Sequence, residues 1–159
     1  LPLFVHVLRI VAKQFITFGH NFIILPVVFI IFSHKVGWEL TLFLPGLVLA
    51  TLNIGCIAFL AAILSARFRD IPQVVSATMT IIYFISPVMW QPSLIPAGTA
   101  HLLLGLNPFY HLLQIVRLPL LGKVPTIENW TISAAAALVG ILVVAKVMNK
   151  YRKKIAYWV

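Results

Sequence analysis

Long uncharged runs alternate with short polar turns along this chain, and the alternation predicts a series of membrane-spanning helices. The clearest boundary is residues 67–72, Arg-Phe-Arg-Asp-Ile-Pro, which separate two long segments that contain no Asp, Glu, Lys or Arg. An uncharged apolar stretch of about 18 or more residues is typical of a spanning helix. We therefore expect spans at about 14–33, 40–64, 72–90 and 130–147.

Local signals refine the expected ends and connections of these spans. Pro26 should kink the first span, because proline interrupts the hydrogen bonds of a helix. Asp70 is placed to cap the third span with its side chain, and Pro72 lies in the first turn of that span. The apolar, proline-rich connection 91–129 is expected to form short helices at the outer leaflet, and residues 148–159 a basic tail.

The composition agrees with a membrane protein. Of the 159 residues, 62% are hydrophobic and 9% are charged, whereas soluble domains contain about 25% charged residues. A net charge of +9 would suggest nucleic-acid binding in a soluble protein. Here the cations gather at the ends of the spans, so we expect no nucleic-acid partner. The expected fold class is an all-α integral membrane protein, a polytopic helical bundle of about four transmembrane helices with short outer helices.

The distribution of Lys and Arg predicts the orientation in the membrane. Nine of the twelve lie before residue 14, in the 67–72 turn, or after residue 145. Loops rich in Lys and Arg remain in the cytoplasm. Both ends of this chain and the 67–72 turn are therefore expected on the cytoplasmic side, where the turn would serve as a charged anchor.

One face of the predicted third span is polar and aromatic. At helical spacing it carries Gln73, Ser76, Thr80, Tyr83, Pro87 and Trp90. In one interpretation the hydroxyl groups bond to their own helix or to a neighbour, and the aromatic rings lie at the membrane interfaces. In the other, this face is the wall of a path for a polar substrate such as a sugar chain, which offers both hydroxyl groups and C–H faces.

A second polar stripe lies in the outer connection, where Asn107-Pro108 is expected to start a short helix. It consists of Asn107, His111, Gln114 and Arg117, spaced as on one face of a helix. The segment is either an interfacial amphipathic helix with its polar face toward water or the lining of an outer gate. In the last span, Ala136 and Gly140 permit close helix packing, within the chain or in a dimer.

Residues for catalysis, metal binding or energy coupling are not apparent in the sequence. The three acids, Glu39, Asp70 and Glu128, fall at the ends of spans, whereas proton relays place ionisable groups inside the membrane. Gly122-Lys123 lacks the rest of a phosphate-binding loop. We therefore expect no catalytic residues, no metal site and no cofactor in this chain, and another subunit must supply energy.

Several motifs occur in the order found in a known family. They are Ile-Thr-Phe-Gly-His-Asn at 16–21, Ala-Arg-Phe-Arg-Asp-Ile-Pro at 66–72, Ile-Ser-Pro-Val-Met-Trp at 85–90, Asn-Pro at 107–108, Arg-Leu-Pro-Leu-Leu-Gly at 117–122 and Tyr-Arg-Lys-Lys-Ile-Ala-Tyr-Trp-Val at 151–159. The chain resembles the permease subunits of ABC-2 type exporters over essentially its whole length. It looks most like the branch that exports O-antigen and capsule-type polysaccharides.

The resemblance implies a homodimer in the bacterial inner membrane, with two ATP-binding cassette subunits that bind ATP and Mg. The expected cargo is an undecaprenyl-diphosphate-linked polysaccharide. Six spans per subunit are implied, so this chain would hold the last four and lack an N-terminal part. The resemblance also implies an outer gate in 91–129, a path lined by residues such as Tyr83 and Trp90, and a contact of Arg67, Arg69 and Asp70 with the ATPase or the diphosphate. Permeation of another cargo, such as teichoic acid, a lipid or a drug, and a membrane-embedded enzyme of glycan assembly are the alternatives.

Overall fold

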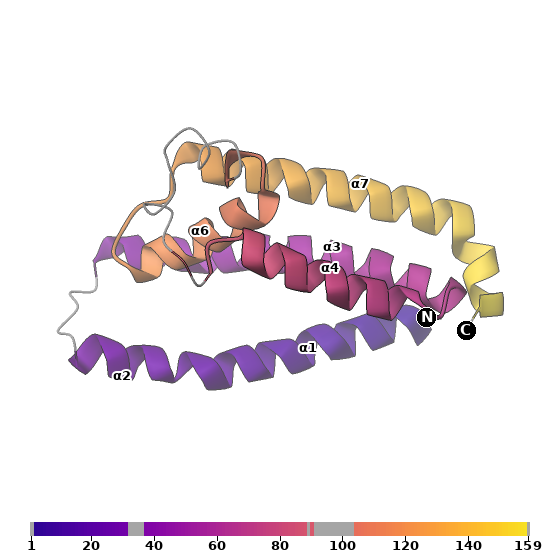
Figure 1. Cartoon of the computed structure of the whole chain (residues 1–159), viewed down its shortest axis with the longest axis horizontal. Helices are drawn as coiled ribbons and strands as arrows, with labels where there is room; N and C mark the ends of the chain where they lie inside the picture. Colours follow the sequence, from indigo (N-terminus) through magenta and orange to yellow (C-terminus); the bar gives the residue numbers. More distant parts are fainter. Residues whose placement is uncertain (1, 32–36, 89, 91–103, 159) are drawn as a thin grey trace.

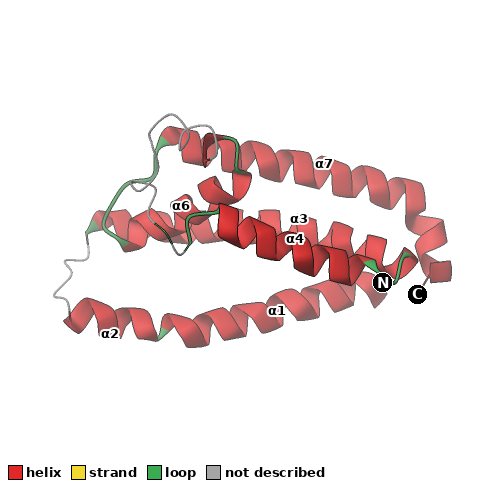
Figure 2. Ribbon diagram, viewed as in Figure 1, coloured by secondary structure: helices red, strands yellow, loops and turns green. Residues whose placement is uncertain are grey.

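Every element of regular structure in the described part of the chain is a helix (Figures 1 and 2). The computed structural model describes residues 2–31, 37–88, 90 and 104–158. Its elements are α1 (Pro2–Phe22), α2 (Ile24–Ile31), the 3-10 helix η1 (Trp38–Leu42), α3 (Phe43–Arg67), α4 (Ile71–Ile85), α6 (Pro108–Leu120) and α7 (Ile127–Trp158). The expected all-α fold is confirmed.

Three stretches of helix among the described residues are long and apolar enough to cross a membrane. They are Leu8–Val27, Trp38–Arg67 and Ile127–Lys150. Helix α4 has 15 residues, which at 1.5 Å per residue span about 22 Å, less than the ~30 Å of a bilayer core. The third span therefore ends as a helix five residues earlier than the sequence predicts. The described residues thus form a helical bundle in which three long apolar stretches are joined by the shorter helices α4 and α6.

The first span is interrupted near Pro26, as its sequence predicts. Helix α1 ends at Phe22, and α2 begins at Ile24. Proline has no N–H to donate to the carbonyl four residues earlier, here that of Phe22, and its ring crowds that carbonyl. The helix therefore breaks one turn before Pro26.

Helix α3 is the centre of the bundle and contacts α1, α4, α6, α7 and η1. Near its C-terminal end, Phe59 and Ile63 pack with Val11 of α1 and Val144 of α7. Nearer its N-terminus, Ala50 packs with Leu112 and Ile115 of α6. The buried apolar surface thus joins α1 to one half of α3 and α6 to the other half, and α7 contributes to both clusters, through Val144 and Trp130.

Two glycines allow neighbouring helices to lie close to α3, one on α3 itself and one on α7. A Cβ atom on Gly46 would lie 2.5 Å from the backbone oxygen of Ile115, so only glycine allows α6 to lie this close. A Cβ atom on Gly140 of α7 would lie 3.1 Å from the Cβ of Cys56. The close packing expected at Gly140 is therefore found within the chain, against α3.

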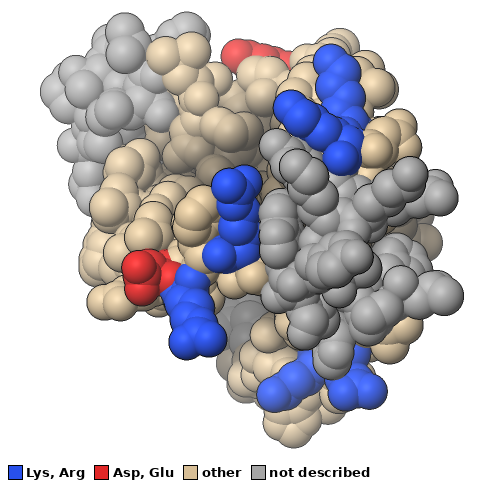
Figure 3. All heavy atoms as spheres, turned by 90° about the vertical axis from the view of Figure 1, so that its right-hand side faces the viewer, with Lys and Arg blue, Asp and Glu red and all other residues tan. Residues whose placement is uncertain are grey.

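The N-terminus, the turn between α3 and α4 and the C-terminus lie at one end of the bundle (Figure 1). Figure 3 views this end and shows Lys and Arg side chains distributed over it. The described basic residues of these three segments are all exposed, namely Arg9, Lys13, Arg67, Arg69, Lys146 and Lys150. The basic segments that the sequence analysis grouped on one side are thus neighbours in space. The backbone of the predicted basic tail continues α7 as far as Trp158.

Candidate functional site

The charged turn between α3 and α4 is formed mainly by backbone hydrogen bonds. Helix α3 ends where Phe68 becomes extended, with its N–H donating to the Leu64 carbonyl at 2.9 Å. Asp70 occupies the N-cap position of α4, but its side chain makes no capping hydrogen bond. Its own backbone is already helical, at φ −86° and ψ −13°, whereas a capping residue is typically extended. The prediction of a side-chain cap at Asp70 was therefore wrong.

The side chains of this turn lie at the surface of the protein. Arg67, Arg69 and Asp70 are all exposed. The guanidinium carbon of Arg67 lies 5.0 Å from the centre of the Phe68 ring, within the range of a cation–π contact. The turn therefore presents positive charge and an aromatic face together.

The polar face of α4 is exposed in the single chain, and the opposite face is partly exposed and partly half-buried. Gln73, Ser76 and Thr80 are exposed, and none of the residues Ile71–Ile85 is buried. The Thr80 hydroxyl donates to the Ser76 carbonyl at 3.0 Å, which satisfies it within its own helix. This hydrogen bond is expected from the interpretation in which the hydroxyl groups bond to their own helix. The interpretation of this face as the wall of a substrate path stays a prediction.

Trp90 does not belong to the helical stripe that the sequence spacing suggested. Because α4 ends at Ile85, the spacing of a helix does not continue to Pro87 and Trp90. The Trp90 indole N–H instead donates to the Phe84 carbonyl at 3.0 Å, so the ring folds back on the last turn. On the helix itself, Tyr83 is the aromatic residue of the polar face, and its side chain is 43% exposed.

The polar stripe of α6 points into the protein. Helix α6 begins at Pro108, as the sequence predicts, and Asn107 caps it, since its side-chain oxygen accepts from the Phe109 N–H at 3.0 Å. Its side-chain nitrogen also donates to the Ser86 hydroxyl at 3.1 Å, just beyond α4. Arg117, at the other end of the stripe, donates from Nη1 to the Pro87 carbonyl at 3.1 Å. Two residues of α6 therefore hold the chain at the point where α4 ends.

His111 connects α6 to α7 in the middle of the stripe. The side chain is only 2% exposed. Its Nε2 lies 3.0 Å from the Gly105 carbonyl, and its Nδ1 lies 2.8 Å from the side-chain oxygen of Asn129 in α7. The tautomer of the ring determines which of the two nitrogens donates in these contacts. His111 thus bonds to α7 and to the segment that precedes α6.

The interpretation of α6 as an interfacial helix with its polar face toward water was wrong. His111 and Gln114 are both buried, and Arg117 is half-buried. Buried polar groups need partners, and the neighbouring helices provide them here for Asn107, His111 and Arg117. The stripe is a hydrogen-bonded connector between α4 and α7, and a gate function for its residues stays a prediction.

The partners of this connector were not identified by sequence reasoning. Ser86 and Asn129 are separated from Asn107 and His111 by 21 and 18 residues. Both are polar residues at the margin of an apolar span, which is the only signal the sequence carries. Residues 91–103, the rest of the predicted gate region, lie outside the described part of the chain.

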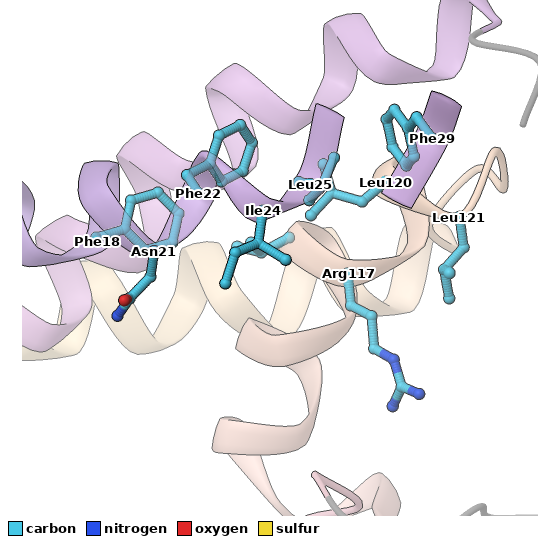
Figure 4. A pocket seen from close by; sticks show the side chains of 10 residues that line it. Phe18, Asn21, Phe22, Ile24, Leu25, Phe29, Arg117, Leu120 and Leu121 are labelled. Atoms are coloured by element: carbon cyan, nitrogen blue, oxygen red, sulfur yellow. The ribbon is translucent and has the colours of Figure 1, made fainter. Parts of the chain in front are cut away.

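A pocket of about 500 Å³ lies between α1–α2 and α6 (Figure 4). Its apolar wall comes from both sides and includes Phe18, Phe22, Leu25, Phe29, Val116 and Leu120. Of its ten lining residues only Asn21 and Arg117 are polar. We call it the α2–α6 pocket. Among the described residues, no group of three His, Cys, Asp or Glu could hold a metal ion.

Comparison with known proteins adds one match. A family model described as ABC-2 type transporter matches residues 2–121, about three quarters of the chain. The matched region runs from α1 to the end of α6 and includes the charged turn, α4 and the α6 connector. Searches of curated proteins and of solved structures found no significant match.

Proposed function

This chain belongs to the ABC-2 type transporter family, and from that premise we propose that it exports a lipid-linked polysaccharide of the O-antigen or capsule type. A membrane domain of this family is the permease component of a transporter and not its ATPase. The family implies a separate ATP-binding cassette partner, which hydrolyses ATP. The observation that carries the permease role is the family match over residues 2–121.

The motifs quoted from the sequence support the choice of cargo. They resemble the polysaccharide branch at the 66–72 turn and at the C-terminal end. The polar and aromatic face of α4 is suited to a glycan, because hydroxyl and amide groups bond to sugar hydroxyls and a tyrosine ring stacks on C–H faces. Teichoic acid, another lipid or a drug would use the same architecture, and the cargo test below distinguishes them.

A homodimer would cover the surface of α4 that is exposed in a single chain. On the apolar face of α4, Val74 is 57% exposed and Ile81 is 58% exposed. Apolar surface of this extent in a membrane protein faces lipid or another helix. In our proposal two copies bring their α4 helices together around a path lined by Gln73, Ser76, Thr80 and Tyr83, with Trp90 at its end.

We further propose that the basic end of the bundle faces the cytoplasm of a bacterial cell. Loops rich in Lys and Arg are retained there, and the three basic segments share this end. The ATPase, which uses cytoplasmic ATP, would meet the exposed Arg67, Arg69 and Asp70. The outer gate would then lie at the opposite end, where α6 and the α6 connector are found.

Copurification tests the ATPase contact. A tagged full-length permease is expected to bring down an ATP-binding cassette protein in stoichiometric amount. Replacing Arg67 and Arg69 together with Glu should reduce the recovered ATPase by at least fivefold, because the turn would then repel acidic groups of the partner. Replacing Lys123 with Glu, at an exposed position distant from the turn in sequence, is the control and should leave recovery unchanged. Full recovery of the ATPase with the double variant would show that the turn acts only as a topological anchor.

Cell-surface glycan tests the cargo and the path. In a strain that lacks the permease, undecaprenyl-diphosphate-linked glycan should accumulate inside the cell, and the full-length protein should restore export. Tyr83→Ala and Trp90→Ala should each lower surface glycan severalfold while the ATPase still copurifies. Ile85→Ala is the control, since Ile85 is an exposed residue on the opposite face of α4. Normal export by both path variants contradicts the proposed path, and accumulation of a different lipid-linked polymer identifies another cargo.

A further inference from the structure

We propose that the α2–α6 pocket binds an anionic phospholipid of the membrane, with an acyl chain among its apolar residues and the phosphate at Arg117. This site differs from the proposed glycan path, because its walls are α1, α2 and α6 and not α4. It would be occupied by a structural lipid rather than by cargo.

The lining of the pocket favours a hydrocarbon chain. Eight of its ten lining residues are apolar, and three of these are phenylalanines. An apolar space beside membrane-spanning helices is not filled by water, because water there would have too few hydrogen-bond partners. The lipid chains that surround such helices are the available occupant.

The position of the pocket along the bundle suits a lipid near the membrane surface. The Phe22 ring stacks on the Phe43 ring with centroids 5.2 Å apart, which places the pocket beside the first turn of α3. Trp38 begins η1 directly before that turn and is 65% exposed. Tryptophan is enriched at the height of lipid headgroups. We therefore infer that the pocket lies close to headgroup height.

Arg117 gives the pocket its charge. It is the single cation among the ten lining residues. One nitrogen donates to the Pro87 carbonyl, and among the described residues no carboxylate forms an ion pair with it. A guanidinium carries five N–H donors in a fork that matches phosphate oxygens. The remaining donors and the uncompensated charge are complementary to a phosphate.

The directions of the lining side chains suit a lipid whose headgroup and acyl chain occupy different parts of the pocket. Figure 4 shows the guanidinium of Arg117 pointing away from the apolar centre, where Leu25 and Leu120 approach each other from α2 and α6. A lipid headgroup can therefore meet the arginine at the rim while the chain passes between these leucines. Asn21, the other polar lining residue, adds an amide at the rim.

Photocrosslinking in nanodiscs tests the site. The full-length permease is placed in phosphatidylcholine that contains phosphatidylglycerol with a photoreactive acyl chain, and crosslinked peptides are mapped by mass spectrometry. We expect adducts on the peptides of α2 and α6. Arg117→Gln, which keeps a donor for Pro87, should lower the yield at least fivefold by removing the charge. Leu25→Trp should do the same by filling the pocket. Lys123→Gln, an exposed cation outside the pocket, should have no effect.

Two further experiments show which lipid occupies the pocket. Photoreactive phosphatidylcholine should label the pocket several times more weakly, and excess undecaprenyl diphosphate should not compete with phosphatidylglycerol. Equal labelling by the two phospholipids overturns the role of the charge, and competition by undecaprenyl diphosphate would assign the pocket to cargo. Undiminished labelling in Leu25→Trp, with its melting temperature unchanged, would show that the lipid binds elsewhere.

Discussion

His111→Ala is expected to destabilise the bundle by about 4 kcal/mol. The substitution leaves the Gly105 carbonyl and the Asn129 side chain without a partner, and each unsatisfied buried group costs about 1–3 kcal/mol. It also opens a cavity, because the imidazole is almost fully buried. Unfolding of the purified protein by SDS titration in mixed micelles measures the difference in free energy.

His20→Ala is the matched control, because His20 lies exposed on α1. A substitution at such a surface position changes stability by about 0.5 kcal/mol or less. His111→Gln should fall between the two, since an amide can replace one of the two hydrogen bonds. Equal stability of His111→Ala and the unsubstituted protein would contradict the role of His111 as the link between α6 and α7.

Gly46→Ala is expected to separate α6 from α3 and to cost about 1–3 kcal/mol, the range for overpacking a filled interior. The new methyl group would lie 2.5 Å from the backbone oxygen of Ile115, and a backbone atom cannot rotate away as a side chain can. The displacement should also disturb the Ala50, Leu112 and Ile115 cluster beside it. The same SDS titration measures the loss.

Gly55→Ala in the same helix provides the control for this glycine. A Cβ atom there meets nothing within 4 Å. Alanine is favoured over glycine inside a helix by about 1 kcal/mol, so this variant should be as stable as the unsubstituted protein or slightly more stable. If the two glycine variants behave alike, the close approach of α3 and α6 does not depend on Gly46.

The sequence predicted the helices well, because their signals are local. An uncharged run that is long enough to cross a bilayer identifies α3 and α7 without any knowledge of their neighbours. Pro26 and the Asn107-Pro108 pair likewise act locally, the first by breaking a helix and the second by starting one. The end of α4 was placed too late, since the apolar run continues after the helix stops at Ile85.

The candidate site was predicted less well, because it depends on contacts between distant segments. A polar stripe has the same spacing whether it faces water, a gate or another helix. Only the neighbours Ser86, Pro87 and Asn129 show that the α6 stripe faces inward. No sequence pattern predicted the α2–α6 pocket either, because it is a space left between two apolar surfaces that do not pack closely against each other.

The way α4 is held has a mechanical consequence. Because none of the residues Ile71–Ile85 is buried, rotating this helix about its own axis would uncover no buried side chain of its own. Resistance to such rotation within one chain comes from the packing of α4 on α3, from the turn at Asp70 and from the hydrogen bonds that Asn107 and Arg117 make beyond the other end. Each hydrogen bond contributes about 1 kcal/mol. Breaking the contacts at the two ends of α4 should therefore make this helix easier to rotate about its own axis.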